Sequence, residues 1–256
     1  MATAILIDGA YFIKRFRKIE PHNSYNADRA ADLAHRWALG HLVQGRTRKD
    51  LYRIFFYDCP PLDKKLHNPI SKRSVDFARS DEAKFRFELH EALRKKRKVA
   101  LRLGNLSNDT PWTIKPLVIE ALLKGRIKFE DLAEGDVMPN VRQKGVDMRI
   151  GIDIATLTMK RQVDQIVLFA GDADFVPAAK LARREGVDFV LDPMWQSVSP
   201  ALDEHIDGMR STCPRIDQNG RRVASRPAAG APAAPAAAPA AANQPNIQPP
   251  VAPQAD

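Results

Sequence analysis

The 256-residue chain has few of the features that disulfide-bonded or membrane proteins need. Its two cysteines, Cys59 and Cys213, lie far apart and form no CxxC pair, so the sequence predicts neither a disulfide framework nor a zinc site. No stretch reaches the roughly 18 apolar residues of a membrane span, and the first residues lack a basic segment ahead of a long apolar one. We therefore expect a protein of the reducing cytoplasm that does not enter a membrane.

The histidines are also poorly spaced for metal binding. None of the six belongs to an HxH or HxxxH pair, the spacings that place two imidazoles on one ion. A metal site in this chain would have to be built mainly from oxygen ligands.

Positive charge, by contrast, is plentiful. Forty Lys and Arg against 31 Asp and Glu give a net charge of +9, which favours a polyanionic partner such as a nucleic acid. A generally basic soluble protein would have the same net charge, because net charge does not locate a patch. The run at 94–98 (Arg-Lys-Lys-Arg-Lys) is either a guide for RNA or a solvated helix end.

Composition divides the chain into two parts. From residue 221 to 256, 22 of 36 residues are Ala or Pro, and such a segment buries too little apolar surface to offset the entropy of ordering. We expect one domain over residues 1–212, with a less regular insertion near 104–140, and a disordered tail over 213–256.

Within the expected domain, short apolar runs alternate with amphipathic stretches, which predicts an α/β fold with a mainly parallel sheet. Such sheets bind ligands beyond the carboxyl ends of their strands. The expected strands are 4–7, 52–57, 99–103, 165–170 and 187–191. The expected helices lie within 28–43, 81–98, 146–161, 174–185 and 200–209.

Carboxylates follow two of these strands. Asp8 ends the first, and Asp172 and Asp174 follow the fourth, with glycine beside the acids in each loop. Singly, Asp174 would cap the next helix and Asp8 would close a turn. Together, like charges at one edge repel one another and usually need a cation.

Two more acids lie on the helix expected over 146–161. Asp147 and Asp153 both flank its apolar stripe, about 60° from Ile150, but differ by about 9 Å in height. Asp147, in the first turn, is the better candidate for a ligand or a water-orienting group. Asp153 is either close behind the site or the anchor of a buried hydrogen-bond network. Carboxylate ligands of this kind suit Mg²⁺ or Mn²⁺, which can activate water against a phosphodiester.

Three motifs carry a family resemblance: LIDGAYF at 6–12, KGVDMRIGIDIATL at 144–157 and FAGDADFVPAAKLARREGVDFVL at 169–191. With them the chain resembles the NYN family of the PIN-like nuclease superfamily, specifically its LabA-like (DUF88) group. The resemblance implies a Rossmann-like PIN fold with a five-stranded sheet in the order 3-2-1-4-5, and pairing of sheet edges into a homodimer. It also implies a metal-dependent endoribonuclease whose acidic positions are Asp8, Asp147, Asp153, Asp172 and Asp174.

The chain departs from many relatives at Tyr11, where they have Asn. A phenol could stack on a base or reach a phosphate instead. Lys144 is a candidate for contacting a substrate phosphate, or a solvated loop lysine. A second function stays open, a catalytically weak RNA-binding or regulatory adaptor on the same fold. A haloacid-dehalogenase-type phosphohydrolase is disfavoured, because it needs a second Asp where Ala10 is found.

The remaining candidates have structural interpretations beside the functional ones. Asp58 is expected to be a turn residue or an extension of the acidic cluster. Trp37 and Phe85 are assigned to packing. Trp112 and Trp195 lie in loop-like contexts, where they could stack on bases or pack against a core or interface.

Overall fold

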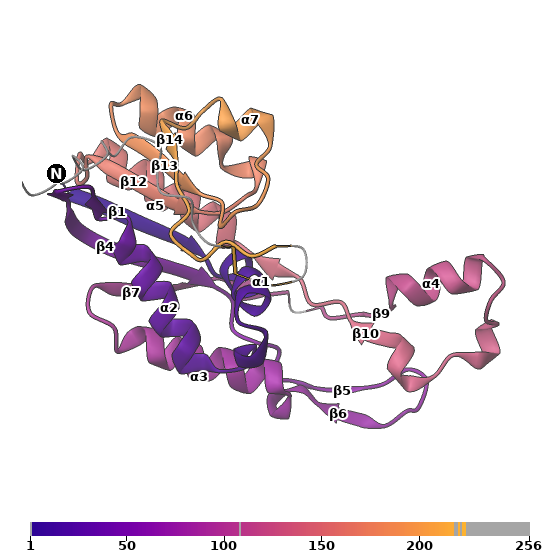
Figure 1. Cartoon of the computed structure of the whole chain (residues 1–256). Coiled ribbons are helices and arrows are strands. Elements are labelled where there is room, and N and C mark those ends of the chain that lie inside the picture. The colour runs from indigo at the N-terminus through magenta and orange to yellow at the C-terminus, as the bar shows by residue number, and fades with distance from the viewer. Residues whose placement is uncertain (1, 108, 218–219, 221, 224–256) are drawn as a thin grey trace, which may run out of the picture. The chain divides into compact units, whose positions relative to one another are not determined.

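The computed structural model describes residues 2–107, 109–217, 220 and 222–223 (Figure 1). The first compact unit of the chain runs from Met1 to Val223, beyond the predicted boundary at residue 212. Cys213 is buried in it, and the indole of Trp195 donates to the Cys213 carbonyl at 2.8 Å. Residues 224–256, which make up most of the predicted tail, lie outside the described residues.

A six-stranded parallel sheet forms the centre of this unit, in the order β14-β13-β12-β1-β4-β7. Numbered along the chain, the first five of these strands lie in the order 3-2-1-4-5 across the sheet, which confirms the predicted order. The strands are β1 (Ala2–Asp8), β4 (Asp50–Asp58), β7 (Val99–Leu103), β12 (Gln165–Phe169), β13 (Asp188–Asp192) and β14 (Gly208–Met209).

The sixth strand corrects the prediction of five strands and of a closing helix over 200–209. Only α7 (Pro200–Asp203) is helical there, capped by the Ser199 side chain. The chain then returns to the sheet, where the Asp207 carboxylate accepts from the Phe189 amide at 2.8 Å. This tertiary hydrogen bond holds the segment after α7 beside β13. Helical periodicity in the sequence gives no sign of such a contact.

Helices cover both faces of the sheet. On one lie α1 (Gly9–Ile19), α2 (Ala27–Gly40) and α3 (Asp81–Arg94); on the other lie α5 (Val146–Met159) and α6 (Val176–Arg184). Alternate residues of β1 feed the two cores, since Ile5 and Ile7 face the first set of helices, and Ala4 and Leu6 face the second. Helix α1 was not predicted from the sequence.

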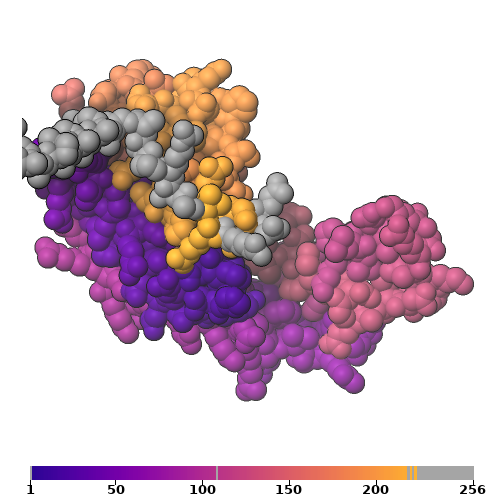
Figure 2. Space-filling model, in the orientation of Figure 1, coloured from indigo at the N-terminus to yellow at the C-terminus, as the bar shows by residue number. Residues whose placement is uncertain are grey.

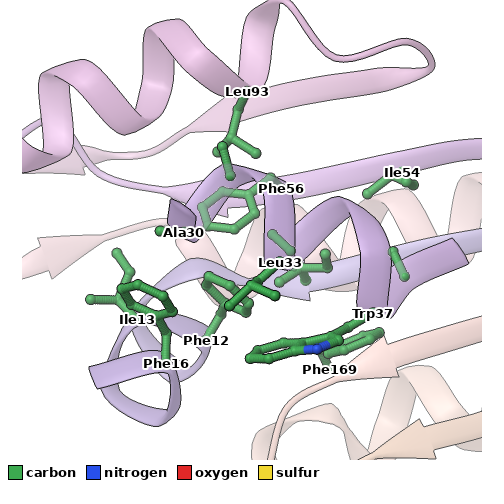
Figure 3. Close-up of a cluster of buried hydrophobic side chains, with 14 of the residues drawn as sticks. Phe12, Ile13, Phe16, Ala30, Leu33, Trp37, Ile54, Phe56, Leu93 and Phe169 are labelled. Atoms are coloured by element: carbon green, nitrogen blue, oxygen red, sulfur yellow. The ribbon is translucent and has the colours of Figure 1, made fainter. Parts of the chain in front are cut away.

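Aromatic side chains fill the first of these cores, as Figure 3 shows. Phe12 of α1 lies against Trp37 of α2 and Phe56 of β4, with ring centroids 5.7 and 5.8 Å apart. Trp37 is 5% exposed and Phe85 is 1% exposed, which confirms the packing role predicted for both. This core holds α1 rigidly against the sheet and therefore fixes its first turn.

Two excursions leave the carboxyl edge of the sheet, one after β4 and one after β7 (Figure 1). The first is a hairpin of β5 (Lys65–His67) and β6 (Ser74–Asp76). The second corresponds to the predicted insertion and contains β8 (Asn105–Leu106), β9 (Trp112–Ile114), α4 (Pro116–Leu123), β10 (Val137–Pro139) and β11 (Gln143–Lys144). The remaining elements are β2 (Val43–Gln44), β3 (Thr47–Arg48) and 3₁₀ turns at Pro21–Asn23, Phe77–Arg79, Phe129–Asp131, Glu134–Asp136 and Ala173–Phe175.

No helix within the described ranges is both long and apolar enough to span a membrane. Both cysteines are buried, and neither forms a disulfide.

Candidate active site

Asp8 is the last residue of β1 and the cap of α1. Its carboxylate accepts from the Tyr11 amide at 3.1 Å, so the side chain is held at the junction of strand and helix. Gly9 makes this junction possible, because a Cβ at that position would lie 2.4 Å from the Tyr57 carbonyl oxygen of β4. Asp8 thus ends a strand, as predicted, and caps a helix where the sequence indicated a turn.

The surroundings of Asp8 disfavour its charge. Burial raises its pKa to about 6, the negative charges of Asp147 and Asp58 add to the increase, and two backbone hydrogen bonds oppose it. A carboxylate kept at a site where ionisation is costly is characteristic of functional positions.

Asp147, Asp172 and Asp174 form the exposed side of the same group. Asp147 lies in the first turn of α5, and its pKa is raised by partial burial and then by the charges of Asp172 and Asp174. Asp172 caps the 3₁₀ turn after β12 by accepting from the Asp174 amide at 3.2 Å. We call Asp8, Asp147, Asp172 and Asp174 the free acids, because none of the four forms an ion pair with another residue that the structure describes.

The free acids influence one another through space but are not drawn tightly together. Among the described residues, no three His, Cys, Asp or Glu side chains lie close enough to hold one metal ion. Binding a single cation would therefore require the exposed carboxylates to turn inward towards Asp8. Because Asp147, Asp172 and Asp174 are exposed, their side chains have the freedom to do so.

Asp153 lies apart from this group on the same helix. Its carboxylate accepts from the Tyr57 hydroxyl at 2.8 Å and pairs with the Arg102 guanidinium at 3.2 Å. Burial, followed by the charge of Asp153, raises the pKa of Tyr57 well above its usual range. Of the two roles left open by the sequence, these contacts match the anchor of a hydrogen-bond network.

Tyr11 lies beside the loop that carries Asp172. Its hydroxyl donates to the Pro193 carbonyl at 2.6 Å, and a Cβ on Gly171 would lie 3.0 Å from its ring. Burial raises the pKa of Tyr11 to about 12. The side chain thus bridges the loops after β12 and β13, which positions the acids next to Gly171.

Lys144 is exposed at the end of the insertion, three residues before Asp147. It lines a hollow of about 420 Å³ together with Lys64 and Asn105. Lys144 thus belongs to the segment that leads into the first turn of α5.

Two further strand-end acids are fully buried and have side-chain partners. Asp58 ends β4, pairs with Arg86 and bonds to His90 at 2.9 Å. Asp192 ends β13 and bonds to His41 at 2.8 Å, while also accepting from the Thr212 amide at 3.1 Å. We call Asp58 and Asp192 the partnered acids.

These pairs were not predicted, although the sequence contains one signal for the first of them. Arg86 and His90 are four residues apart on α3, so both reach Asp58 from one helix face. Asp58 is therefore neither a simple turn residue nor part of the free acids. The His41–Asp192 pair joins residues 151 positions apart and has no local signal.

The other candidates lie outside the acidic group. Trp112 contacts Phe77, with ring centroids 6.1 Å apart, and Trp195 is 44% exposed beneath the Arg215 guanidinium. The basic run at 94–98 lies between the end of α3 and the start of β7. It is therefore at the amino edge of the parallel sheet, opposite the free acids, and this corrects its interpretation as a guide to the site.

The sequence profile of the NYN domain matches residues 87–209, a range that contains Asp147, Asp172 and Asp174 but not Asp8. No curated protein matches the chain. A crystal structure of a protein of unknown function from Vibrio parahaemolyticus RIMD 2210633 is 15% identical, covers 81% of this chain and 90% of its own, and has a TM-score of 0.39. Residues 87–209 of this chain are therefore similar to the NYN domain, a domain of the PIN-like nuclease superfamily.

Proposed function

We propose that this protein is a divalent-metal-dependent endoribonuclease that hydrolyses RNA phosphodiesters at the free acids. One observation carries the proposal. At the carboxyl edge of a PIN-like sheet, four carboxylates have no cationic partner within the described part of the chain, and two of them, Asp8 and Asp147, have raised pKa values. An arrangement that is costly without a cation is the arrangement that a cation would stabilise.

The donor chemistry fits Mg²⁺ or Mn²⁺. The free acids offer only carboxylate oxygens, the ligands that hard divalent ions prefer, and no imidazole or thiol competes among them. Asp8, Asp147, Asp172 and Asp174 would hold the ion. When bound, it supplies an activated water and stabilises the negative charge that develops on the phosphodiester.

The chain's own residues divide the remaining work. Asp8 is fixed by the cap of α1 and gives the site a rigid point, whereas the exposed Asp172 and Asp174 can adjust to the ion and the substrate. Lys144 would contact a neighbouring phosphate. Tyr11 holds the 171–174 loop through Gly171 and Pro193, and Asp153 braces α5 against β4.

A second function has one observation in its favour. The free acids, as they lie, do not form a set of ligands for one metal ion. A catalytically weak RNA-binding or regulatory adaptor would not need such a set. In both cases the partner is RNA, and a cytoplasmic location, a homodimer and membership of the LabA-like group belong to the same proposal.

The test is cleavage of single-stranded and structured RNA with Mn²⁺, with and without EDTA, by the full chain and by Asp172→Asn. We expect cleavage that EDTA and the substitution each abolish. Metal-dependent cleavage that survives Asp172→Asn would refute the site. RNA binding without cleavage in the unaltered protein would establish the adaptor instead.

A further inference from the structure

The hairpin that follows β4 concentrates positive charge away from the acids. Residues 63–79, which we call the basic hairpin, contain five Lys and Arg against two Asp. The insertion that leaves the same edge is different, since residues 112–140 contain four Lys and Arg against five Asp and Glu. Of these two segments, the basic hairpin therefore carries the excess of positive charge and the insertion does not.

The charges of the basic hairpin are largely available to a partner. All five basic side chains are exposed, namely Lys64, Lys65, Lys72, Arg73 and Arg79. Among the residues that the structure describes, only Lys65 and Arg79 of these five form an ion pair, and both pair with Asp76, at 3.9 and 3.6 Å. Contacts that long between exposed groups are weak and would yield readily to phosphate.

The hairpin is a built structure and not a loose loop. Asn68 is 2% exposed, and its side-chain oxygen accepts from the amides of Ile70 and Ser71 at 2.9 and 3.2 Å. The side-chain nitrogen of Asn68 donates to the Glu134 carbonyl of the insertion at 3.2 Å. The ring of Phe77 also packs on Trp112 of the insertion. The insertion thus supports the hairpin from the side, and Figure 2 shows the two projecting together from the body of the domain.

One hollow lies between the base of the hairpin and the segment that leads to Asp147. Lys64 at the base of the hairpin, Asp63 beside it and Lys144 all line this hollow of about 420 Å³, and Lys144 is three residues before Asp147 in the sequence. The hairpin follows β4, and β11 pairs with β8, which directly follows β7, so both lie at the carboxyl edge of the sheet. The basic residues of the hairpin and Lys144 are therefore at the edge that carries the acids.

We propose that the basic hairpin binds the sugar-phosphate backbone of an RNA strand whose reacting segment lies at the free acids. The inference rests on the proposed function only for the identity of the strand as substrate. Side chains of this kind bind phosphates without reading bases, so the hairpin adds affinity in proportion to strand length and not to sequence. A strand too short to reach beyond the hollow gains nothing from it.

The test measures binding by fluorescence anisotropy in EDTA, so that turnover is absent. The probes are labelled single-stranded RNAs of about 20 and about 5 nucleotides. The hairpin variant is Lys64→Gln, Lys65→Gln, Lys72→Gln and Arg73→Gln together. The matched control removes four charges at the amino edge, through Arg94→Gln, Lys95→Gln, Lys96→Gln and Arg97→Gln.

We expect the hairpin variant to bind the longer RNA at least tenfold more weakly at about 50 mM salt and the control to change less than threefold. Each phosphate contact contributes roughly 0.7 to the slope of log affinity against log salt. Loss of the four basic side chains should therefore reduce the magnitude of that slope by about 2 to 3. The shorter RNA should bind all three proteins alike. Equal losses in hairpin variant and control, or no loss in the hairpin variant, would overturn the inference.

A second variant guards against misfolding. Asp76→Asn keeps an oxygen that can accept from the Ala78 amide, now at 3.2 Å, while removing the counter-charge of Lys65 and Arg79. It should tighten binding of the longer RNA about two- to fivefold, a gain that damage to the fold would not produce. Failure of the proposed function is distinguishable, because cleavage would then be absent while these binding differences remain.

Discussion

Asp8 and Asp58 end neighbouring strands of the same sheet, yet the protein treats their charges in opposite ways. Asp58 is fully buried between Arg86 and His90, whereas Asp8 accepts from backbone donors, lies near other acids and forms no ion pair in the described part of the chain. Asp192 resembles Asp58 in being buried against a side-chain partner, and Asp147, Asp172 and Asp174 resemble Asp8 in forming no ion pair with a described residue. The acids at the margins of the site thus have side-chain partners, and those at its centre have no cationic partner among the described residues.

This difference separates two uses of a carboxylate. A buried carboxylate with a full set of partners contributes to the fold, and removing it leaves its cations without a counter-charge. A carboxylate without a cation costs stability in the protein alone, and such a cost is maintained at functional sites. The two groups should therefore respond to the same substitution, Asp to Asn, with opposite signs.

Asp58→Asn should have the largest effect. The side chain of Arg86 is 13% exposed and would keep only Glu82 as an anionic neighbour, so we expect a loss of about 3 kcal/mol in the free energy of unfolding. Urea denaturation monitored by circular dichroism measures it. A change below about 0.5 kcal/mol, the size usual for surface substitutions, would remove the distinction between the two groups.

Asp8→Asn should instead stabilise the protein in EDTA, by about 3 kcal/mol above pH 6. The folded pKa of about 6 exceeds the ordinary 3.8, so ionisation favours the unfolded chain. This penalty is absent below pH 3.8, grows as the pH rises and is complete above pH 6. Asparagine removes it and can still cap α1. Denaturation at several pH values should show the gain disappearing towards pH 4; a loss at every pH would contradict it.

Asp153→Asn should destabilise only slightly, by about 0.5–1 kcal/mol. The amide oxygen still accepts from Tyr57, and the lost ion pair involves Arg102, whose side chain is 48% exposed. Arg102→Gln and the double variant complete a thermodynamic cycle that measures the coupling directly. If Asp153→Asn abolished Mn²⁺ binding while Arg102→Gln left it unchanged, Asp153 would belong with the free acids.

Asp172→Asn should have the smallest effect on stability, within about 0.5 kcal/mol, since the side chain is exposed and its amide oxygen can replace the cap to Asp174. Thermal denaturation in EDTA measures this. A marked destabilisation would assign Asp172 a structural role, and any loss of cleavage in that variant would then be uninformative.

The strands and the acids at their ends could be predicted because both depend on local patterns, whereas the sheet order came from the family resemblance. The apolar run before Asp8 and the Gly-Asp-Ala-Asp loop after β12 mark buried strands and the edge where they end. Helix α1 was missed because it begins at Gly9, directly after Asp8, with no loop between strand and helix. The sixth strand depends on the tertiary bond between Asp207 and Phe189.

Which acids have side-chain partners could not be read from the chain in the same way. Asp58 and Asp8 both end apolar strands in the sequence, and only packing brings α3 and its Arg86 and His90 over one of them. The pairing of Asp192 with His41 similarly requires the end of α2 to reach the end of β13. The sequence shows where the carboxylates lie along the strands, whereas the three-dimensional arrangement determines which of them have side-chain partners.

Isothermal titration calorimetry with Mn²⁺ is the most direct test of the central claim, that the free acids are kept without cations in order to bind one. The unaltered protein should bind Mn²⁺, Asp8→Asn should lose at least about tenfold in affinity, equal to about 1.4 kcal/mol, and Asp50→Asn should not change. Asp50 is an exposed acid at the start of β4, on the opposite edge of the sheet. Equal Mn²⁺ affinity in all three proteins would contradict the account.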